Sequence, residues 1–197
     1  MITFVMLVEG GNLDNAVGTL ENNLPRLIHT WNVLVLTKDK NYPRIRNRIY
    51  ETLDTMPNQQ FRGECLVTYN EKTTYKQARS FLTGYGDFDY VYLWNNGKVP
   101  MGVIQELIDI CLDHFLHTGL VGYGDTYYAL ADDKLYNQRA RMKKCSPKQR
   151  VTQVTATPIN NVLLRASTFM QCSLENDKIG LELRRKGYQN FLLRGGK

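Results

Sequence analysis

The stretch Asp87–Gly97, DFDYVYLWNNG, holds a short apolar run between two polar turns. Tyr90–Leu93 has the length and composition of a buried strand. The polar turn Asn95-Asn96-Gly97 closes that strand, and Pro100 then opens a helix, because proline suits the first helical turn. The stretch therefore predicts a strand that ends in a polar turn and leads into a helix.

The same alternation of strands and helices continues on both sides of this strand. Further strands are predicted at residues 2–8, 32–36, 64–69, 120–123, 162–164 and 189–194, and helices after Asn12, Pro43, Lys76 and Pro100 and over 174–186. Residues 124–150 show no clear pattern. Such alternation forms right-handed βαβ units. We therefore expect an α/β fold, with a mostly parallel central sheet flanked by helices.

Composition limits the class of protein. The chain has 197 residues, of which 43% are hydrophobic, enough for the core of one domain. Its apolar runs are too short to span a bilayer, and Met1–Val8 is typical of a core strand rather than of a signal peptide. We therefore expect a single soluble, cytoplasmic domain over residues 1–197.

The cysteines and histidines do not predict a metal centre. Cys65, Cys111, Cys145 and Cys172 are scattered, without a CxxC pair, and are interpreted as free thiols that fill the core. His114 and His117 stand three residues apart, but the sequence offers no third ligand near them.

The net charge of +6 is concentrated in two runs. Arg139–Arg150 holds six basic residues and no acidic one, and Arg44, Arg46 and Arg48 follow Pro43. Such runs are typical either of solvated surfaces or of a surface that attracts a polyanion. Nucleic acid is not the favoured partner, because the sequence has no RNA- or DNA-binding motif.

Two segments resemble the GT-A glycosyltransferases, in particular the inverting, family-2-like enzymes. The first runs from Lys76-Gln77-Ala78-Arg79-Ser80 to Asn95-Asn96-Gly97 and Pro100, and the second is Glu175–Tyr188. Length and overall sequence are also similar to members from viruses of archaea. The resemblance implies a single-domain GT-A fold, with a nucleotide-binding half at 1–97 and an acceptor-side half at 98–197. It implies sugar transfer from a nucleotide-sugar donor to a hydroxyl of a protein or glycan acceptor.

The resemblance also assigns roles to residues at the strand ends, where parallel sheets bind ligands. Asp39 corresponds to the acid that contacts the nucleoside, and Glu9 lies where the family backbone packs on the base. Arg79 corresponds to an arginine near the diphosphate. Asn95, Asn96 and Gly97 occupy the place of the DxD motif, which holds Mn²⁺ or Mg²⁺ against the nucleotide. The basic run Arg139–Arg150 lies where it could neutralise the leaving diphosphate.

The sequence departs from the family at the metal motif. Divalent cations prefer anionic oxygen ligands, and Asn95 and Asn96 offer only amide oxygens. Asp87 and Asp89 form a literal DxD pair, but before the strand rather than after it. A divalent cation held by Asp87, Asp89 or Asn95 is therefore one hypothesis, and a polar turn without a metal is the other.

The second departure concerns the general base. The family's base aspartate corresponds to Asn176, which cannot accept a proton at neutral pH. Asp177 is the favoured replacement and Glu175 the second. Both acids are equally typical of a helix start, where they complement the helix dipole.

Three alternatives to a glycosyltransferase stay open. A non-catalytic nucleotide-binding protein fits the asparagines at both key positions, and a nucleic-acid-binding protein fits the basic runs. A nucleotidyltransferase would share the layout, but Glu9-Gly10-Gly11-Asn12 is a poor match to its glycine-rich phosphate loop.

Overall fold

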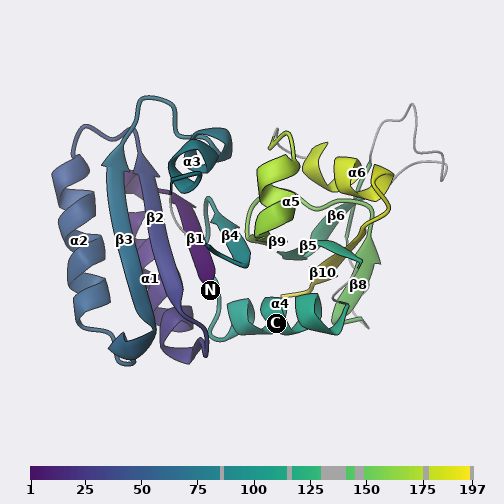
Figure 1. Ribbon diagram of the computed structural model, residues 1–197, viewed down its shortest axis with the longest axis horizontal. Helices are drawn as coiled ribbons and strands as arrows, with labels where there is room; N and C mark the ends of the chain where they lie inside the picture. The colour runs from purple at the N-terminus through teal and green to yellow at the C-terminus, as the bar shows by residue number, and fades with distance from the viewer. Residues whose placement is uncertain (85–86, 115–116, 130–140, 145–148, 175–177, 196–197) are drawn as a thin grey trace. The chain divides into compact units, whose positions relative to one another are not determined.

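The computed structural model describes residues 1–84, 87–114, 117–129, 141–144, 149–174 and 178–195. The chain divides into two compact units, Met1–Glu106 and Leu107–Lys197. Each unit combines a β-sheet with helices (Figure 1). The predicted α/β class with mostly parallel strand pairs is confirmed.

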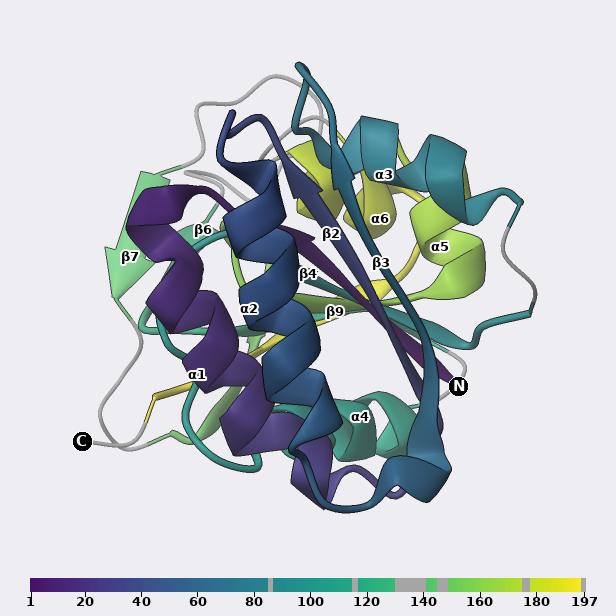
Figure 2. The same cartoon turned by 90° about the vertical axis from the view of Figure 1, so that its left-hand side faces the viewer.

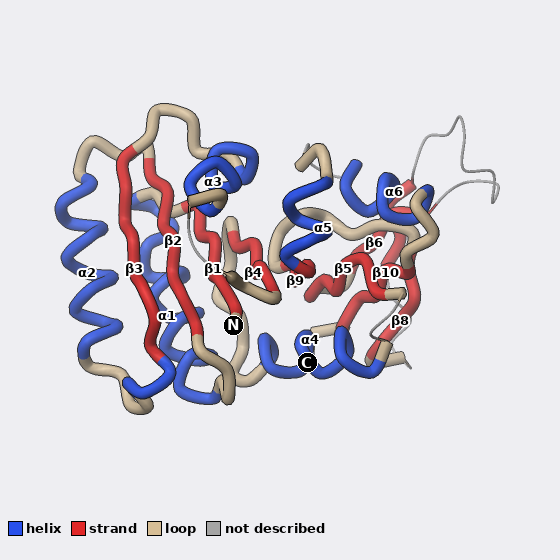
Figure 3. The backbone as a smooth tube through the Cα atoms, viewed as in Figure 1, coloured by secondary structure: helices blue, strands red, loops and turns tan. Residues whose placement is uncertain are grey.

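The first unit contains a parallel sheet with the strand order β3-β2-β1-β4 (Figure 3). Its strands are β1 (Ile2–Leu7), β2 (Trp31–Thr37), β3 (Arg62–Tyr69) and β4 (Tyr90–Trp94). Nearly every residue of β1 and β2 is buried. Burial on both faces explains why these strands are continuous apolar runs rather than alternating ones.

Helices connect these strands and cover the sheet. They are α1 (Leu13–Asn23), α2 (Tyr42–Asp54) and α3 (Tyr75–Leu82), with the 3₁₀ turns η1 (Gly10–Asn12), η2 (Leu24–Arg26) and η3 (Gln59–Phe61). Helices α1 and α2 lie side by side along the sheet (Figure 2). The chain moves one way from β1 to β3 and then returns past β1 to β4. Right-handed crossovers therefore place α3 on the face opposite to α1 and α2.

The second unit has a mixed sheet with the order β9-β5-β10-β8. Strand β5 (Thr118–Tyr123) pairs in parallel with β10 (Gln189–Leu193) and antiparallel with β9 (Val162–Arg165). Strand β8 (Val151–Val154) runs antiparallel to β10, and β6 (Thr126–Ala129) and β7 (Arg141–Lys144) form a separate antiparallel pair. The helices are α4 (Val103–Asp113), which begins in the first unit, α5 (Ala166–Gln171) and α6 (Lys178–Arg185).

Several local predictions need correction. Pro100 does not open α4, because the helix begins at Val103 after a turn in which Gly102 has a φ of 75°. Strand β8 and helix α5, with four and six residues, were not predicted because elements this short show no periodicity. Gly187, with a φ of 89°, follows the last turn of α6 and ends this helix, close to the predicted end at residue 186.

The described cysteines Cys65, Cys111 and Cys172 are not in disulfide bonds, as predicted. Burial raises the pKa of both Cys65 and Cys111 to about 11. Both thiols are therefore protonated at neutral pH, which suits a packing role. Within the described part of the chain, no helix is long and apolar enough to cross a lipid bilayer.

Candidate functional site

The carboxyl ends of β1 and β4 lie next to each other in the first unit. The two strands are parallel, and Met6 is paired with Trp94 near their ends. The chain leaves β1 towards β2, on the side away from β4, so the strand order reverses at this point. Parallel α/β sheets bind ligands at such reversals, outside the carboxyl ends of the strands. The segments at this position are residues 8–12 and 95–99.

The side chain of Asn12 joins these two segments. Its amide nitrogen donates to the carbonyl oxygens of Leu7 (3.2 Å) and Asn95 (2.9 Å), and its amide oxygen accepts the Glu9 N–H at 2.8 Å. Asn12 stands at the start of α1, as predicted, but its side chain makes no capping hydrogen bond to that helix. It connects the ends of two strands instead.

Asp39 joins the ends of β1 and β2 in the same way. One carboxylate oxygen accepts the Gly10 N–H at 2.9 Å, and the other accepts the Asn41 N–H at 2.8 Å. A Cβ added at Gly10 would lie 2.9 Å from the Asp39 carboxylate, so a side chain at position 10 would displace this carboxylate. Beside it, Glu9 and Lys38 form an exposed ion pair at 3.0 Å. Two of the predicted nucleotide-binding residues, Glu9 and Asp39, are thus adjacent.

The turn Asn95-Asn96-Gly97 is held by hydrogen bonds from its neighbours. Gly97 has a φ of 82° and donates its N–H to the Asn96 side-chain oxygen at 2.8 Å. Its carbonyl accepts the indole N–H of Trp94 at 2.9 Å. Trp94 is fully buried, so this residue belongs to the core.

Polar residues on the inner face of α1 hold the segment that follows the turn. The Thr19 hydroxyl accepts the Val99 N–H at 3.1 Å. The amides of Asn22 and Asn23 donate to the Val99 carbonyl, and Asn23 accepts the Ile104 N–H. These roles were not predicted from the sequence. The only local sign of them is the spacing of Thr19, Asn22 and Asn23 along one helix.

The donor set at this edge does not fit a divalent cation. The motif itself supplies amide and carbonyl oxygens, and the Asn96 oxygen already accepts a hydrogen bond. The nearby carboxylates of Glu9 and Asp39 bind Lys38 and backbone N–H groups. Within the described ranges, no group of three or more histidine, cysteine or acidic residues could hold a metal. At the Asn95–Gly97 turn itself, Mn²⁺ or Mg²⁺ would find only neutral oxygens, whereas both cations prefer anionic ones.

Asp87 and Asp89 lie at the other edge of the sheet. Asp89 precedes β4, its N–H donates to the Met1 carbonyl, and its carboxylate pairs with the amino terminus of Met1. Strand β4 separates Asp89 from Asn95 by about 20 Å, at about 3.3 Å per residue. The structure therefore does not bring Asp89 together with Asn95, although both were candidate ligands of one cation.

The remaining predicted residues belong to other segments of the chain. Arg79 is half-buried within α3, whose first turn is capped by the Thr74 hydroxyl. Glu175 and Asp177, the candidate bases, lie outside the described residues, as do Asn176 and half of Arg139–Arg150. The roles of Arg79, Glu175 and Asp177 stay predictions.

Comparison with solved structures shows the fold. GalNAc-T7, solved with UDP, GalNAc and Mn²⁺, is similar with a TM-score of 0.68 and 12% identity over 98% of this chain and 43% of that chain. CMP:2-keto-3-deoxy-manno-octonic acid synthetase, solved with CTP, matches with a TM-score of 0.55 and 9% identity over 100% of this chain and 90% of that one. The 4-diphosphocytidyl-2C-methyl-D-erythritol synthase of Anaerococcus prevotii matches with a TM-score of 0.57 and 10% identity, over 100% and 89%.

The fold is that of nucleotide-diphospho-sugar transferases and related nucleotidyltransferases. At these identities the likeness concerns the fold alone, and the chain spans less than half of GalNAc-T7. No family model and no curated protein matches the sequence. None of these similarities bears on a viral source for the chain.

Proposed function

We propose that the chain is a glycosyltransferase that moves a sugar from a nucleotide-sugar to an acceptor hydroxyl. The observation that supports this most is the sheet edge of the first unit at the carboxyl ends of its strands. There, hydrogen bonds from Asn12 and to Asp39 hold together the ends of β1, β2 and β4. Because the loops are fixed before a ligand arrives, little ordering entropy opposes binding. Asp39 and the backbone of Glu9–Gly11 are the proposed contacts of the nucleoside.

The roles in the second unit follow from the family resemblance. We assign the general base to Asp177, with Glu175 as the second candidate, acting on a protein or glycan acceptor. An inverting outcome is part of the same proposal. Nucleotide binding at the Asn95–Gly97 turn is proposed to need no cation there, because the donor set lacks free carboxylates.

Nucleotide binding can be measured by thermal shift with UDP, GDP, ADP and CDP, each with Mn²⁺ and with EDTA. A ligand that binds the native state only, at a hundred times its Kd, stabilises it by about 2.7 kcal/mol. We expect stabilisation by at least one nucleoside diphosphate in both conditions. If nucleotides stabilise the protein in Mn²⁺ but not in EDTA, the proposal that binding at the Asn95–Gly97 turn needs no cation is contradicted. If no nucleotide stabilises the protein in either condition, the proposed function is contradicted.

Catalysis is tested by release of nucleoside diphosphate from nucleotide-sugars. Asp177→Asn should bind nucleotide as the wild type does and lose transfer. Glu175→Gln tests the second candidate in the same assay and should keep transfer if Asp177 is the base. Unchanged transfer in Asp177→Asn would remove Asp177 from the mechanism.

A nucleotidyltransferase is the second candidate, because two cytidylyl-type synthases share the fold over about nine-tenths of their length. The two reactions release different products. Pyrophosphate released from CTP would indicate nucleotidyl transfer, whereas nucleoside diphosphate released from a nucleotide-sugar indicates sugar transfer.

A further inference from the structure

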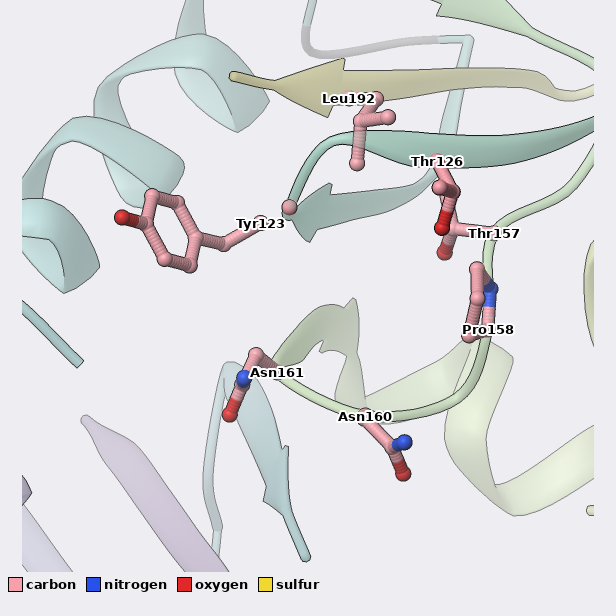
Figure 4. A pocket seen from close by; sticks show the side chains of 8 residues that line it. Tyr123, Thr126, Thr157, Pro158, Asn160, Asn161 and Leu192 are labelled. Carbon is pink, nitrogen blue, oxygen red and sulfur yellow. The ribbon is translucent and has the colours of Figure 1, made fainter. Parts of the chain in front are cut away.

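A charged groove, the α1–α2 groove, lies on the surface of the first unit between helices α1 and α2, which run side by side (Figure 2). Its volume is about 460 Å³, and it is lined by Leu13, Asp14, Pro43, Arg44, Asn47, Arg48 and Glu51. In a second cavity, of about 190 Å³ in the second unit, no described lining residue is charged (Figure 4). Of the two, the α1–α2 groove can recognise a ligand by its charge.

Helical spacing decides which arginines of α2 line the groove. Arg44 and Arg48 stand four residues apart, so they are neighbours on one face of the helix. Arg46 is two residues from each of them and does not line the groove. Ile45 and Ile49 are buried and form the core face of α2. The basic run of the sequence is thus divided, with two arginines at the groove and one outside it.

The guanidinium groups of Arg44 and Arg48 are available to a ligand. Both residues are exposed, and neither guanidinium forms a hydrogen bond or ion pair with another described residue. By contrast, the guanidinium of Arg62 pairs with Asp54 at 2.6 Å. Two like charges four residues apart on a helix repel each other. An anion held between Arg44 and Arg48 replaces this repulsion with two attractions.

The two acids that line the groove do not occupy these arginines. Asp14 is in the first turn of α1, and Glu51 is three residues after Arg48 on α2. Both acids are exposed, and neither carboxylate is ion-paired with a described residue. Each acid therefore lowers the affinity of the groove for an anion through its charge alone. Removing either charge should strengthen anion binding.

The chemistry of the groove selects a phosphate monoester as the ligand. A guanidinium group presents N–H donors in a planar fork that matches the oxygens of a phosphate. A monoester carries about two negative charges at neutral pH, which matches two guanidinium groups. The Asn47 amide is a further donor, and Leu13 and Pro43 give apolar surface for the rest of the ligand. A carboxylate, with one charge, would match only one arginine.

We propose that the α1–α2 groove binds the phosphate group of a phosphate monoester, with Arg44 and Arg48 holding its oxygens. The groove is separate from the proposed nucleotide contacts, which are Asp39 and the backbone of Glu9–Gly11. The inference goes beyond the proposed function and does not depend on it. A soluble phosphate ester and the headgroup of a lipid such as phosphatidic acid both present the required group.

The test is an NMR titration of ¹⁵N-labelled full-length protein with sodium phosphate, with sodium chloride at equal ionic strength as the reference. We expect phosphate to shift the amides of Leu13, Asp14 and Asn47. Arg44→Gln and Arg48→Gln should each weaken phosphate binding about tenfold, or about 1.4 kcal/mol. Absence of these shifts, or equal shifts with chloride, would overturn the proposal.

Arg46→Gln is the matched control. It removes the same charge from the same helix, but Arg46 does not line the groove, so phosphate binding should stay within about twofold of the wild type. Asp14→Asn and Glu51→Gln should strengthen binding, an effect of opposite sign that general loosening of the helices would not produce. Equal weakening by Arg46→Gln and Arg44→Gln would show diffuse attraction only and would overturn the site.

Two further probes distinguish the sources of the phosphate. Groove shifts with glycerol 3-phosphate, without binding to vesicles of phosphatidylcholine and phosphatidic acid, identify a soluble ester. Binding to these vesicles that Arg44→Gln weakens and Arg46→Gln does not identifies a lipid headgroup.

The phosphate titration is then repeated with a saturating nucleoside diphosphate. Groove shifts that persist support a separate site. Their loss would show that the groove holds the phosphates of the nucleotide, and would overturn the separate site. If phosphate shifts the groove while no nucleotide binds the protein, the groove stands and the proposed function fails.

Discussion

At the scale of single residues, the side chains of Asn12 and Asp39 each hold two loops at the strand ends together. Asn12 spans 83 residues of sequence to reach Asn95, and Asp39 spans 29 to reach Gly10. Both bind backbone groups, so they fix the path of the chain whatever the neighbouring side chains are. The predicted nucleotide residues Glu9, Asp39 and Asn95 are thus held in one arrangement.

Replacing Asn12 by alanine should therefore loosen this edge. The variant removes the bonds to Leu7, Glu9 and Asn95, and a typical hydrogen bond contributes about 0.5–1.5 kcal/mol. We expect a lower urea midpoint and a smaller thermal shift with nucleotide. Asn15→Ala is the control, because no described hydrogen bond uses the Asn15 side chain. Equal losses in both variants would refute a special role for Asn12.

Glu182 makes part of the stability of the second unit depend on pH. Burial alone would raise the pKa of this carboxyl, but hydrogen bonds from the Ser173 N–H (3.0 Å) and from Lys186 (2.9 Å) lower it below its ordinary value of 4.5. A depressed folded-state pKa adds stability above pH 4.5, which is lost as the pH falls through the folded value.

The Glu182→Gln variant should accordingly lose stability at neutral pH and differ less from the wild type in acid. The measurement is the urea midpoint from neutral pH down to below pH 4. Glu21→Gln, at an exposed position on α1, is the control. A difference between Glu182→Gln and the wild type that does not change with pH would show that the carboxylate charge is irrelevant.

At the scale of elements, helix α6 packs against its neighbours through glycine. A Cβ added at Gly180 would lie 2.6 Å from the Ala156 Cβ and 2.8 Å from its Cα. Asn190, which is fully buried, donates to the carbonyls of Gly180 and Thr155. The helix, β10 and the segment after β8 therefore meet at close range.

Gly180→Ala should force these elements apart and cost about 1–3 kcal/mol, the usual effect of overpacking. Gly11→Ala is the control, because nothing lies within 4 Å of a Cβ there. The free energy of unfolding from urea denaturation compares the two. If Gly180→Ala leaves the free energy of unfolding unchanged, α6 can shift away from Ala156 without cost, and the tight packing is not needed for stability.

At the scale of the whole molecule, the net charge of +6 invites non-specific binding to polyanions. Such binding releases counterions, so it weakens steeply as salt rises. A site built from hydrogen bonds and a nucleoside pocket depends less on salt. We expect any DNA binding to be lost between 50 and 200 mM salt, whereas the thermal shift with nucleotide persists. DNA affinity that outlasts nucleotide binding at high salt would favour the nucleic-acid-binding alternative.

The sequence alone determined the class of the fold and the position of the strand ends. Both depend on local features, namely apolar runs of strand length and helical spacing within about fifteen residues. The turn at Asn95–Gly97 follows β4 for the same reason. The elements that were not predicted, such as α5 and β8, are short. Too few of their residues are available to show a periodic pattern of apolar positions.

Only the tertiary structure decided which strand ends are tied together. The contacts that decide this join residues far apart in sequence. They are the hydrogen bonds Asn12–Asn95 and Asp39–Gly10, the ion pair of Asp89 with Met1, and the packing of Thr157 on Gly122. Their side chains are common in loops and carry no local pattern. From its sequence neighbours, Asn12 is only the residue before a predicted helix. It links two strands because β1 and β4 lie side by side in the sheet.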